Sequence, residues 1–438
     1  MIAAHLERMR CPACFGDLAV ASVVRGDGDA IEFGLVRCRC ASYPVIDGIL
    51  LLGRRDTGAF VPLLAKGDVA GLVALLADKR WAGGWFTPVD IEWGPQDVLE
   101  RAPATLFAAA DRIREVASEG PLLAVREVLS HFKYFHATPK YLAALALIEV
   151  LRRQAPRHVI DLGSGAGHLG ELALRHVQAE TVYLVDVTGR SLLLARWMFP
   201  DPARCACVRV DANQPLPFKD GVVDAVISAD AIHYMESKAA LFRELGRVVR
   251  RDGSLLLTHL HNAEQPAEPS QGFSLSAQTW RALFDEALGG DGQLLSDEAI
   301  REAFAAGRPL GPAIGSAALD GARSFSFVSP RRMLEAPPTA GFLEHPLGDA
   351  IFNPVYEVAR AGTAIRLSRL PVTPTFDAEH AYPDPPAEHV VEAGALSDRA
   401  ELARLRRRGI LIDAPVRMVD TRGRRAADYI EHADPSRS

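Results

Sequence analysis

The chain has 438 residues, of which 48% are hydrophobic and 24% are charged, and its formal net charge is −6. This composition is typical of globular proteins, and the length exceeds what one core usually holds, so we expect two or three domains. The acidic balance argues against a protein that coats nucleic acid, and no run approaches the roughly 20 apolar residues of a membrane helix. The first residues, "MIAAHLERMRCPAC", carry charges where a signal peptide is apolar, so we expect a cytoplasmic protein with no membrane partner.

Two close pairs of cysteines open the chain: "CPAC" holds Cys11 and Cys14, and "CRC" holds Cys38 and Cys40. Four thiolates on two tight turns suit a structural Zn²⁺ ion in tetrahedral coordination. Between the pairs, two β-prone runs flank "GDGD", which predicts a hairpin. Together these features predict a zinc ribbon over residues 1–53. The alternative is four free or buried cysteines without a metal.

The two cysteine motifs and the stretch "YPVIDGILLL" that follows them resemble a known family. Its members are zinc-ribbon activator subunits that partner methyltransferases acting on tRNA, rRNA and translation factors. The resemblance covers residues 8–53 and implies a ribbon fused to the enzyme that it assists.

Beyond the ribbon, apolar residues recur at helical spacing through most of residues 54–137, which predicts a helical lid or linker. Over residues 138–330, short apolar runs then alternate with helical patterns, among them a helix predicted over 237–253. This alternation predicts an α/β fold with a Rossmann-like, doubly wound sheet. Ligands of such sheets bind at the carboxyl ends of the strands.

The first predicted strand leads into the turn "DLGSGAGHLG", in which Gly163, Gly165 and Gly167 let the backbone approach a ligand closely. A dinucleotide fingerprint would need its third glycine at position 168, which is His. The pattern therefore favours S-adenosylmethionine. The alternative is a nicotinamide-dinucleotide fold whose glycines only form a tight turn.

Carboxylates stand where the next strands are expected to end. Asp161 can orient the glycine turn and face the cationic amino end of S-adenosylmethionine. Asp186 can accept both ribose hydroxyls, as the ribose-binding acid does in dinucleotide folds. Asp211 can accept the adenine amino group, with the Ala212 backbone beside it.

Four motifs of residues 138–262 occur in the order found in class I S-adenosylmethionine-dependent methyltransferases, and this region resembles the quinone-biosynthesis-like branch of that family. The motifs are "VIDLGSGAGHLG", "YLVDVT", "VRVDANQPLPFKDGVVDAVISADAIHYM" and "LGRVVRRDGSLLLT". The resemblance implies methyl transfer and places two residues, Ser228 and Ala229, near the methyl group. The cofactor-binding residues that it implies are Asp161, Gly163, Ser164, Gly165, Gly167, Asp186, Val187, Asp211, Ala212, Ser228 and Ala229.

Methyl transfer from a sulfonium is an in-line displacement, so the enzyme mainly aligns the acceptor with the methyl carbon and the sulfur. His233 follows the fourth predicted strand and could remove a proton from the acceptor, or could instead pack over the cofactor. Tyr234 could donate a hydrogen bond to the acceptor. Both are candidate catalytic residues.

Residues 331–438 exceed what this family needs, and we expect a C-terminal α+β extension that docks a substrate or a protein partner. Two strand-like runs around a glycine turn, a proline-rich stretch and a helix ending at Gly409 support that expectation. The arginines at 404, 406, 407 and 408 could contact RNA or another anion, or could complement the end of the helix.

Three functions follow from these patterns. The leading hypothesis is a methyltransferase acting on a small-molecule acceptor of secondary-metabolite or quinone-like kind, as in natural-product biosynthesis. The second is an rRNA or tRNA methyltransferase with a zinc module for RNA, although the acidic charge makes nucleic acid the less favoured partner. The third is a non-catalytic scaffold that binds the cofactor and docks a partner.

Overall fold

The computed structural model describes most of the chain outside the predicted lid. The described residues are 1–68, 71–72, 75–76, 135, 138–199, 201–265, 272–311, 319, 321–337, 339, 341–348, 350–353, 356–369 and 388–413. Most of the predicted helical lid, and residues 370–387 and 414–438 of the predicted extension, therefore lie outside the described residues.

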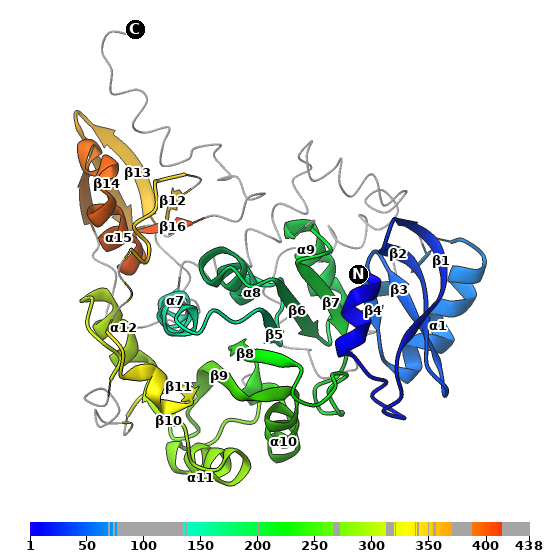
Figure 1. Ribbon diagram of the computed structural model, residues 1–438. Helices are drawn as coiled ribbons and strands as arrows, with labels where there is room; N and C mark the ends of the chain where they lie inside the picture. The colour runs from blue at the N-terminus through cyan, green and yellow to red at the C-terminus, as the bar shows by residue number, and fades with distance from the viewer. Residues whose placement is uncertain are drawn as a thin grey trace, which may run out of the picture.

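One sheet of eleven strands runs through the molecule (Figure 1). Its order is β1-β2-β3-β4-β7-β6-β5-β8-β9-β11-β10, and the strands from β7 to β9 are parallel. The central strands step outward from β5 in both directions, as the doubly wound prediction requires. The strands are β1 (Ala19–Asp27), β2 (Ala30–Arg37), β3 (Ser42–Ile46), β4 (Ile49–Leu51), β5 (His158–Leu162), β6 (Thr181–Asp186), β7 (Cys205–Arg209), β8 (Val223–Ala229), β9 (Val249–His261), β10 (Gln293–Ser296) and β11 (Ser324–Ser329).

The N-terminal strands continue the central sheet. β1 and β2 form the hairpin predicted around "GDGD", and β2, β3 and β4 follow as an antiparallel meander. β4 then pairs in parallel with β7, with Ile49 opposite Cys207 and Leu51 opposite Arg209. All three β4 residues are buried, as expected for a parallel strand covered on both faces. The predicted ribbon segment therefore shares a core with the sheet.

Helices cover both faces of the sheet (Figure 1). Alternate residues of each strand point to opposite faces, so β5 contributes Val159 to one apolar core and Ile160 to the other. Cys205 and Cys207 lie buried in the first core, as predicted. Among the described residues, no helix is both long and apolar enough to cross a membrane. The first face packs against α1 (Arg54–Ala65), α7 (Pro139–Arg152), α8 (His168–Leu172), α9 (Gly189–Met198) and α12 (Asp297–Ala305), and the second against α10 (Lys238–Val248) and α11 (Ala277–Leu288).

The described part of the C-terminal extension contains both strands and a helix around a separate apolar core that includes Ile365, Leu367 and Leu405. β12 pairs with β16, and β13, β14 and β15 form an antiparallel meander. The elements are β12 (Ala350–Phe352), β13 (Tyr356–Ala361), β14 (Ala364–Arg369), β15 (Glu388–Glu392), α15 (Arg399–Arg407) and β16 (Leu411–Asp413).

Most of the arginine cluster of α15 is engaged inside the protein. Arg407 forms a double hydrogen bond with Glu149 of α7, at 2.9 and 3.0 Å. Arg406 is buried, contacts Asp413 at 2.9 Å and donates to three backbone carbonyls. Arg404 pairs with a glutamate of its own helix. These contacts hold the extension against α7 and weaken the hypothesis of an RNA-binding surface here.

Candidate active site

The glycine turn lies between β5 and α8, and its three glycines have φ angles of +67°, +53° and +84°. The backbone N–H groups of Gly163 and Ser164 donate to the Val185 carbonyl at 2.8 and 3.2 Å, which anchors the turn to the end of β6. A Cβ at Gly163 would lie 2.3 Å from the Cβ of Ala231, so only glycine fits there. At Gly165, a Cβ would meet no described atom within 4 Å. The turn therefore packs tightly on one side and presents open backbone on the other.

Asp161, in β5, is hydrogen-bonded to α8 beyond the turn; the role predicted for it, orienting the turn and facing the amino end of S-adenosylmethionine, stays a prediction. Its buried carboxylate accepts the N–H of Gly170 in α8 at 2.8 Å. Burial raises the pKa of Asp161 to about 7; the Gly170 N–H opposes this rise, and the negative charge of Asp186 adds to it. A cation bound nearby would favour the ionised form of Asp161.

Asp186 ends β6 and joins the strand directly to the glycine turn. One carboxylate oxygen accepts the N–H of Gly165 at 2.8 Å, and the other accepts the N–H of Thr188 at 2.7 Å. Burial raises the pKa of Asp186, and the backbone N–H groups partly oppose that rise. The hydroxyl of Thr188 and the N–H of Val187 also contact this carboxylate, so it lies among several donors at the end of β6. Val187 follows, and its carbonyl accepts a hydrogen bond from Arg209 at 2.9 Å.

The loop after β7 lies beside Asp186, because the N–H of Val210 donates to the Asp186 carbonyl at 3.0 Å. Asp211 is exposed in this loop, and its carboxylate accepts the backbone N–H of Asn213 at 2.9 Å. Ala212 is buried next to it. The structure thus brings the second and third predicted carboxylates to neighbouring strand ends.

Two serines near the turn have different surroundings. Ser228, in β8, is fully buried and its hydroxyl donates a hydrogen bond to the Leu162 carbonyl at 2.7 Å, which joins β8 to β5. The role of Ser228 toward a cofactor stays a prediction. Ala229 is partly exposed beyond it. Ser164 is also buried, but its hydroxyl has no hydrogen-bond partner among the described residues. An unpaired buried hydroxyl in this turn fits a bound polar molecule such as the methionine portion of S-adenosylmethionine.

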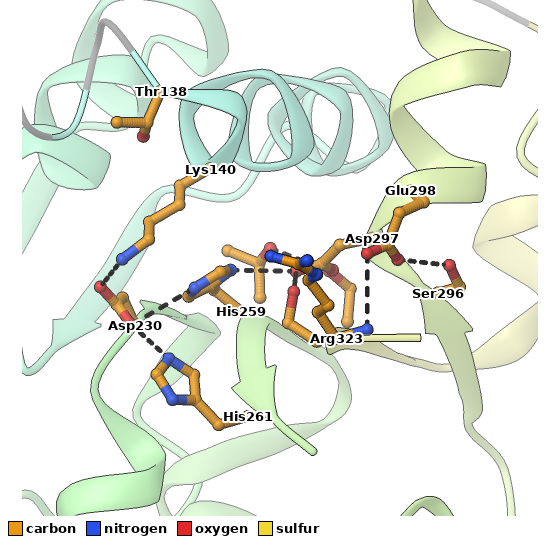
Figure 2. Close-up of polar contacts among 12 residues, drawn as sticks. Thr138, Lys140, Asp230, His259, His261, Ser296, Asp297, Glu298 and Arg323 are labelled. Carbon is orange, nitrogen blue, oxygen red and sulfur yellow. Dashed lines mark hydrogen bonds and ion pairs between the residues drawn. The ribbon is translucent and has the colours of Figure 1, made fainter. Parts of the chain in front are cut away.

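A second polar group lies where β8 and β9 end. The sequence predicts Asp230 at this edge of the sheet, as it does Asp186 and Asp211, but the sequence analysis did not identify the residues around it. Asp230 follows β8, and its carboxylate contacts Lys140 at 2.6 Å, His261 at 3.1 Å and His259 at 3.8 Å (Figure 2). Asp297 of α12 contacts the other ring nitrogen of His259 at 3.3 Å. We refer to Lys140, Asp230, His259, His261 and Asp297 as the Asp230 cluster.

The charges of this cluster are set mainly by burial and by Lys140. Burial alone would raise the pKa of Asp230, but Lys140, His259 and His261 outweigh it and hold that pKa well below its usual range. Burial, together with the charge of Lys140, lowers the pKa of His259 to about 4. Asp230 is therefore ionised and His259 is neutral near pH 7.

The two candidate catalytic residues lie beside the Asp230 cluster. His233 is fully buried, stacks on His261 with ring centroids 3.8 Å apart, and has no hydrogen-bond partner for either ring nitrogen among the described residues. Its Nε2 lies 3.8 Å from the Asp230 carboxylate. Burial lowers the pKa of His233 well below its usual value, so its ring is neutral and its protonated form is disfavoured in this buried position; its role as a base stays a prediction. Tyr234 packs against His233 and is partly exposed.

The four ribbon cysteines converge on one point. The Sγ atoms of Cys11 and Cys40 are 3.6 Å apart, those of Cys14 and Cys38 are 3.7 Å apart, and those of Cys38 and Cys40 are 3.4 Å apart. Tetrahedral zinc with Zn–S bonds of about 2.3 Å separates its sulfur ligands by about 3.8 Å. The donor set and its spacing fit a structural zinc ion.

Comparison with known proteins places the glycine turn and the strands after it in a family. Residues 160–257 match the model of the Methyltransferase domain. A Malonyl-[acyl-carrier protein] O-methyltransferase of Legionella pneumophila is 36% identical over 107 residues, which are 24% of this chain and 37% of that protein. A ubiquinone/menaquinone biosynthesis C-methyltransferase of Chromobacterium violaceum is 28% identical over 116 residues, 26% of this chain and 48% of the relative.

Among solved structures, the YcgJ protein of Bacillus subtilis is 22% identical, covering 34% of this chain and 68% of its own, with a TM-score of 0.29. The chain spans well under half of the first curated relative's length, and the similarity falls on the segment that holds the glycine turn, Asp186 and Asp211. Residues 160–257 of the chain thus match a methyltransferase domain, and the strands around them form a Rossmann-like α/β sheet.

Proposed function

We propose that the protein transfers the methyl group of S-adenosylmethionine to a small-molecule acceptor. The observation that carries this proposal is the hydrogen bond between the Asp186 carboxylate and the N–H of Gly165. This contact supports the proposal because it joins a carboxylate that could accept the ribose hydroxyls to the partly exposed backbone of Gly165. The match of this segment to the Methyltransferase domain supports the same cofactor.

The residues of the pocket would divide the binding between them. The open backbone of the glycine turn and the unpaired hydroxyl of Ser164 face the methionine portion, Asp186 accepts the ribose hydroxyls, and Asp211 accepts the adenine amino group beside Ala212. When bound, S-adenosylmethionine supplies an electrophilic methyl group. The protein's task is then to align the acceptor with it.

His233 and Tyr234 are our candidates for acting on the acceptor. The neutral ring of His233 has a nitrogen with no hydrogen-bond partner among the described residues, so it can accept a proton from a hydroxyl or amine. The partly exposed Tyr234 can donate a hydrogen bond to the acceptor. Ser228 and Ala229 would lie below the methyl group at the end of β8.

The acceptor that we favour is a small molecule of secondary-metabolite or quinone-like kind. The curated relatives include a quinone-biosynthesis C-methyltransferase and O-methyltransferases of malonyl-[acyl-carrier protein], which supports small acyl or ring acceptors. An RNA acceptor is less favoured, because the chain has a net charge of −6 and two of the four clustered arginines, Arg406 and Arg407, are engaged in buried contacts.

We also infer that the four ribbon cysteines bind a structural Zn²⁺ ion and that the ribbon assists the enzyme in cis. The Sγ spacing supports the metal, and the pairing of β4 with β7 supports the assistance, since it places the ribbon on the strand that precedes Asp211. The C-terminal extension would then dock a substrate or a protein partner.

Calorimetry tests the cofactor site. Wild-type protein is titrated with S-adenosylmethionine and with S-adenosylhomocysteine, alongside Asp186→Ala and the control Asp252→Ala, an exposed carboxylate in β9. Loss of hydrogen bonds to a charged group costs about 1.5–3 kcal/mol, so Asp186→Ala should weaken binding roughly 10- to 100-fold while the control binds normally. Binding of a nicotinamide dinucleotide in place of S-adenosylmethionine would contradict the proposal.

Label transfer tests the reaction. The protein is incubated with methyl-labelled S-adenosylmethionine and a fractionated extract of the source organism, and mass spectrometry locates the label. Label in a small molecule supports the proposal. Label in RNA, with binding that weakens steeply as salt increases, would favour the RNA methyltransferase. Tight cofactor binding with no labelled product in any fraction would favour the scaffold.

A further inference from the structure

We propose that Asp230, His259 and His261 form a binding site for a divalent transition-metal ion of the Zn²⁺ or Fe²⁺ class. This site is separate from the ribbon cysteines and does not depend on the proposed methyl transfer. It lies at the carboxyl ends of β8 and β9, where the sheet carries its ligands.

Three ligand atoms converge there. One oxygen of Asp230 lies 3.1 Å from Nε2 of His261 and 3.8 Å from Nε2 of His259, and the three potential ligand atoms all lie within 4.8 Å of one another. A tetrahedral ion with bonds of about 2.0–2.1 Å separates its ligands by about 3.3 Å. The two imidazole rings are inclined at 89°, so their nitrogens approach a common point from different directions.

A hydrogen-bond network alone explains this geometry poorly. The 3.8 Å separation between His259 and Asp230 is too long for a hydrogen bond. His261 does lie within hydrogen-bond distance of the same carboxylate oxygen, at 3.1 Å, so His259 approaches this oxygen without a direct bond to it. Two ligands of one ion need no direct bond between them, and a spacing of this size is normal for such a pair.

The backbone also turns the ligands inward. Asp230 has φ +56° and His259 has φ +57°, values in the left-handed region that non-glycine residues rarely adopt. Such conformations are unfavourable and cluster at functional sites, because the surrounding structure has to maintain them. Here they occur at two proposed ligands, Asp230 directly after β8 and His259 in the neighbouring strand β9.

The residues around the ligands match the outer layer of a metal site. Histidine ligands of metals usually donate their other ring N–H to a carboxylate, which fixes the ring orientation. Nδ1 of His259 lies 3.3 Å from Asp297 (Figure 2). Asp297 is itself held by the hydroxyls of Ser324 and Ser326, at 2.7 and 2.5 Å. This arrangement points Nε2 of His259 toward Asp230 and His261.

Lys140 does not occupy the proposed metal-binding oxygen. It contacts Oδ2 of Asp230 at 2.6 Å, whereas both histidines lie near Oδ1. Its positive charge opposes a nearby cation, but the carboxylates of Asp230 and Asp297 together outweigh it. Two histidines with one carboxylate are the ligand set of catalytic zinc and of non-haem iron(II), and three protein ligands leave positions open for water or for a substrate oxygen.

The site borders the proposed cofactor pocket. Ala231, next to Asp230, is the residue against which Gly163 packs. A metal-bound oxygen ligand would therefore lie on the acceptor side of the glycine turn. The ligand class that we infer is an oxygen-donor molecule, such as a hydroxyl, enol or carboxylate compound.

Metal content tests this proposal. Untagged wild-type protein is stripped with a chelator and titrated with Zn²⁺ alone, and bound metal is counted by mass spectrometry. We expect two equivalents. The double variant Cys38→Ser/Cys40→Ser should retain one equivalent, and the variants Asp230→Asn, His259→Ala and His261→Ala should each lose one. His176→Ala, which removes a buried histidine outside the Asp230 cluster, should keep both.

Cobalt distinguishes the two sites by ligand type. With Co²⁺, the ribbon should give thiolate-to-metal charge-transfer bands, and the second equivalent should give only the weaker bands of nitrogen and oxygen ligands. A wild type that binds cobalt with thiolate-type bands only, or variants of the Asp230 cluster that bind as much metal as the wild type, would overturn the proposal. If the histidine variants do not fold, the near-isosteric Asp230→Asn variant and the wild-type cobalt spectrum decide it. Calorimetry with S-adenosylmethionine, run in parallel, shows separately whether the methyltransferase proposal holds.

Discussion

Replacing Gly163 with alanine should destabilise the protein much more than the same change at Gly165, two residues away in the same turn. Both glycines have positive φ angles, +67° and +53°, so an alanine at either position has a backbone cost of about 1–2 kcal/mol. Only at Gly163 does the new Cβ collide with a neighbour, since it would lie 2.3 Å from the Cβ of Ala231 whereas ordinary contact begins near 3.4 Å. Overpacking of this kind adds about 1–3 kcal/mol. We therefore expect losses of about 2–5 kcal/mol for Gly163→Ala and about 1–2 kcal/mol for Gly165→Ala.

For cofactor binding, the substitution at Gly165 should be the more informative one, because it should weaken binding although it destabilises the protein less. A Cβ at Gly165 meets no described atom within 4 Å, so it would project into the space that we assign to the methionine portion of S-adenosylmethionine. Gly165→Ala should thus weaken binding at least about tenfold, or about 1.4 kcal/mol, while the protein stays folded.

Urea unfolding and calorimetry measure the two quantities. The double variant Gly163→Ala/Ala231→Gly is the matched control, because it removes the colliding methyl group and should recover the stability of Gly165→Ala. Equal unfolding midpoints for the two single variants would refute the packing argument. A Gly165→Ala protein that binds S-adenosylmethionine as the wild type does would refute the placement of the cofactor.

Three further predictions concern pH, the C-terminal extension and zinc. Asp161 has a pKa raised to about 7, so a cation bound beside it should displace a proton, and the affinity for S-adenosylmethionine should rise between about pH 6 and about pH 8. Calorimetry in buffers of different ionisation enthalpy should detect the released proton. The variant Asp161→Asn should abolish the pH dependence. Arg407→Ala removes the charged partner of the buried Glu149 and should lower the free energy of unfolding by about 3 kcal/mol, as measured with urea. Arg404→Ala, at an exposed position, should lower it by less than about 1 kcal/mol. Equal losses would contradict the docking role of the Arg407–Glu149 pair. Removal of zinc by a chelator should speed hydrogen exchange in β4 and also in β7, and unchanged exchange in β7 would show that the ribbon does not support the central sheet.

The sequence was informative wherever the determinants are local. Short, continuously apolar runs between helical patterns predicted the parallel strands of the sheet, because strands buried on both faces are apolar throughout. Asp161 was singled out because it precedes a glycine turn; the structure shows its hydrogen bond to Gly170 of α8, and its role toward the turn and the cofactor stays a prediction. Asp186 was expected at a strand end because acids there face the ligand edge of a doubly wound sheet, and it lies there.

Other features depend on contacts between distant segments, and the sequence alone could not predict them. The Asp230 cluster draws Lys140 from α7, Asp297 from α12 and two histidines from the end of β9. The spacing of His259 and His261 was the available signal, but it was hidden within an apolar strand pattern. Likewise, the helix predicted to run to Gly253 ends at Val248, because the next residues pair with β8 as the start of β9.

The pairing of the ribbon with the central sheet also depends on distant segments, and it affects how the chain matures during translation. Leu51 lies opposite Arg209, so the ribosome must add about 150 further residues, at about 10 residues per second, before the ribbon can meet its neighbour in the sheet. For roughly 15 s, the apolar edge of β4 has no strand to cover it, and such an edge is a template for aggregation. If the four cysteines bind zinc as we propose, early capture of the metal would order the N-terminal strands before β7 is made, and metal supply during synthesis would then affect the yield of folded protein.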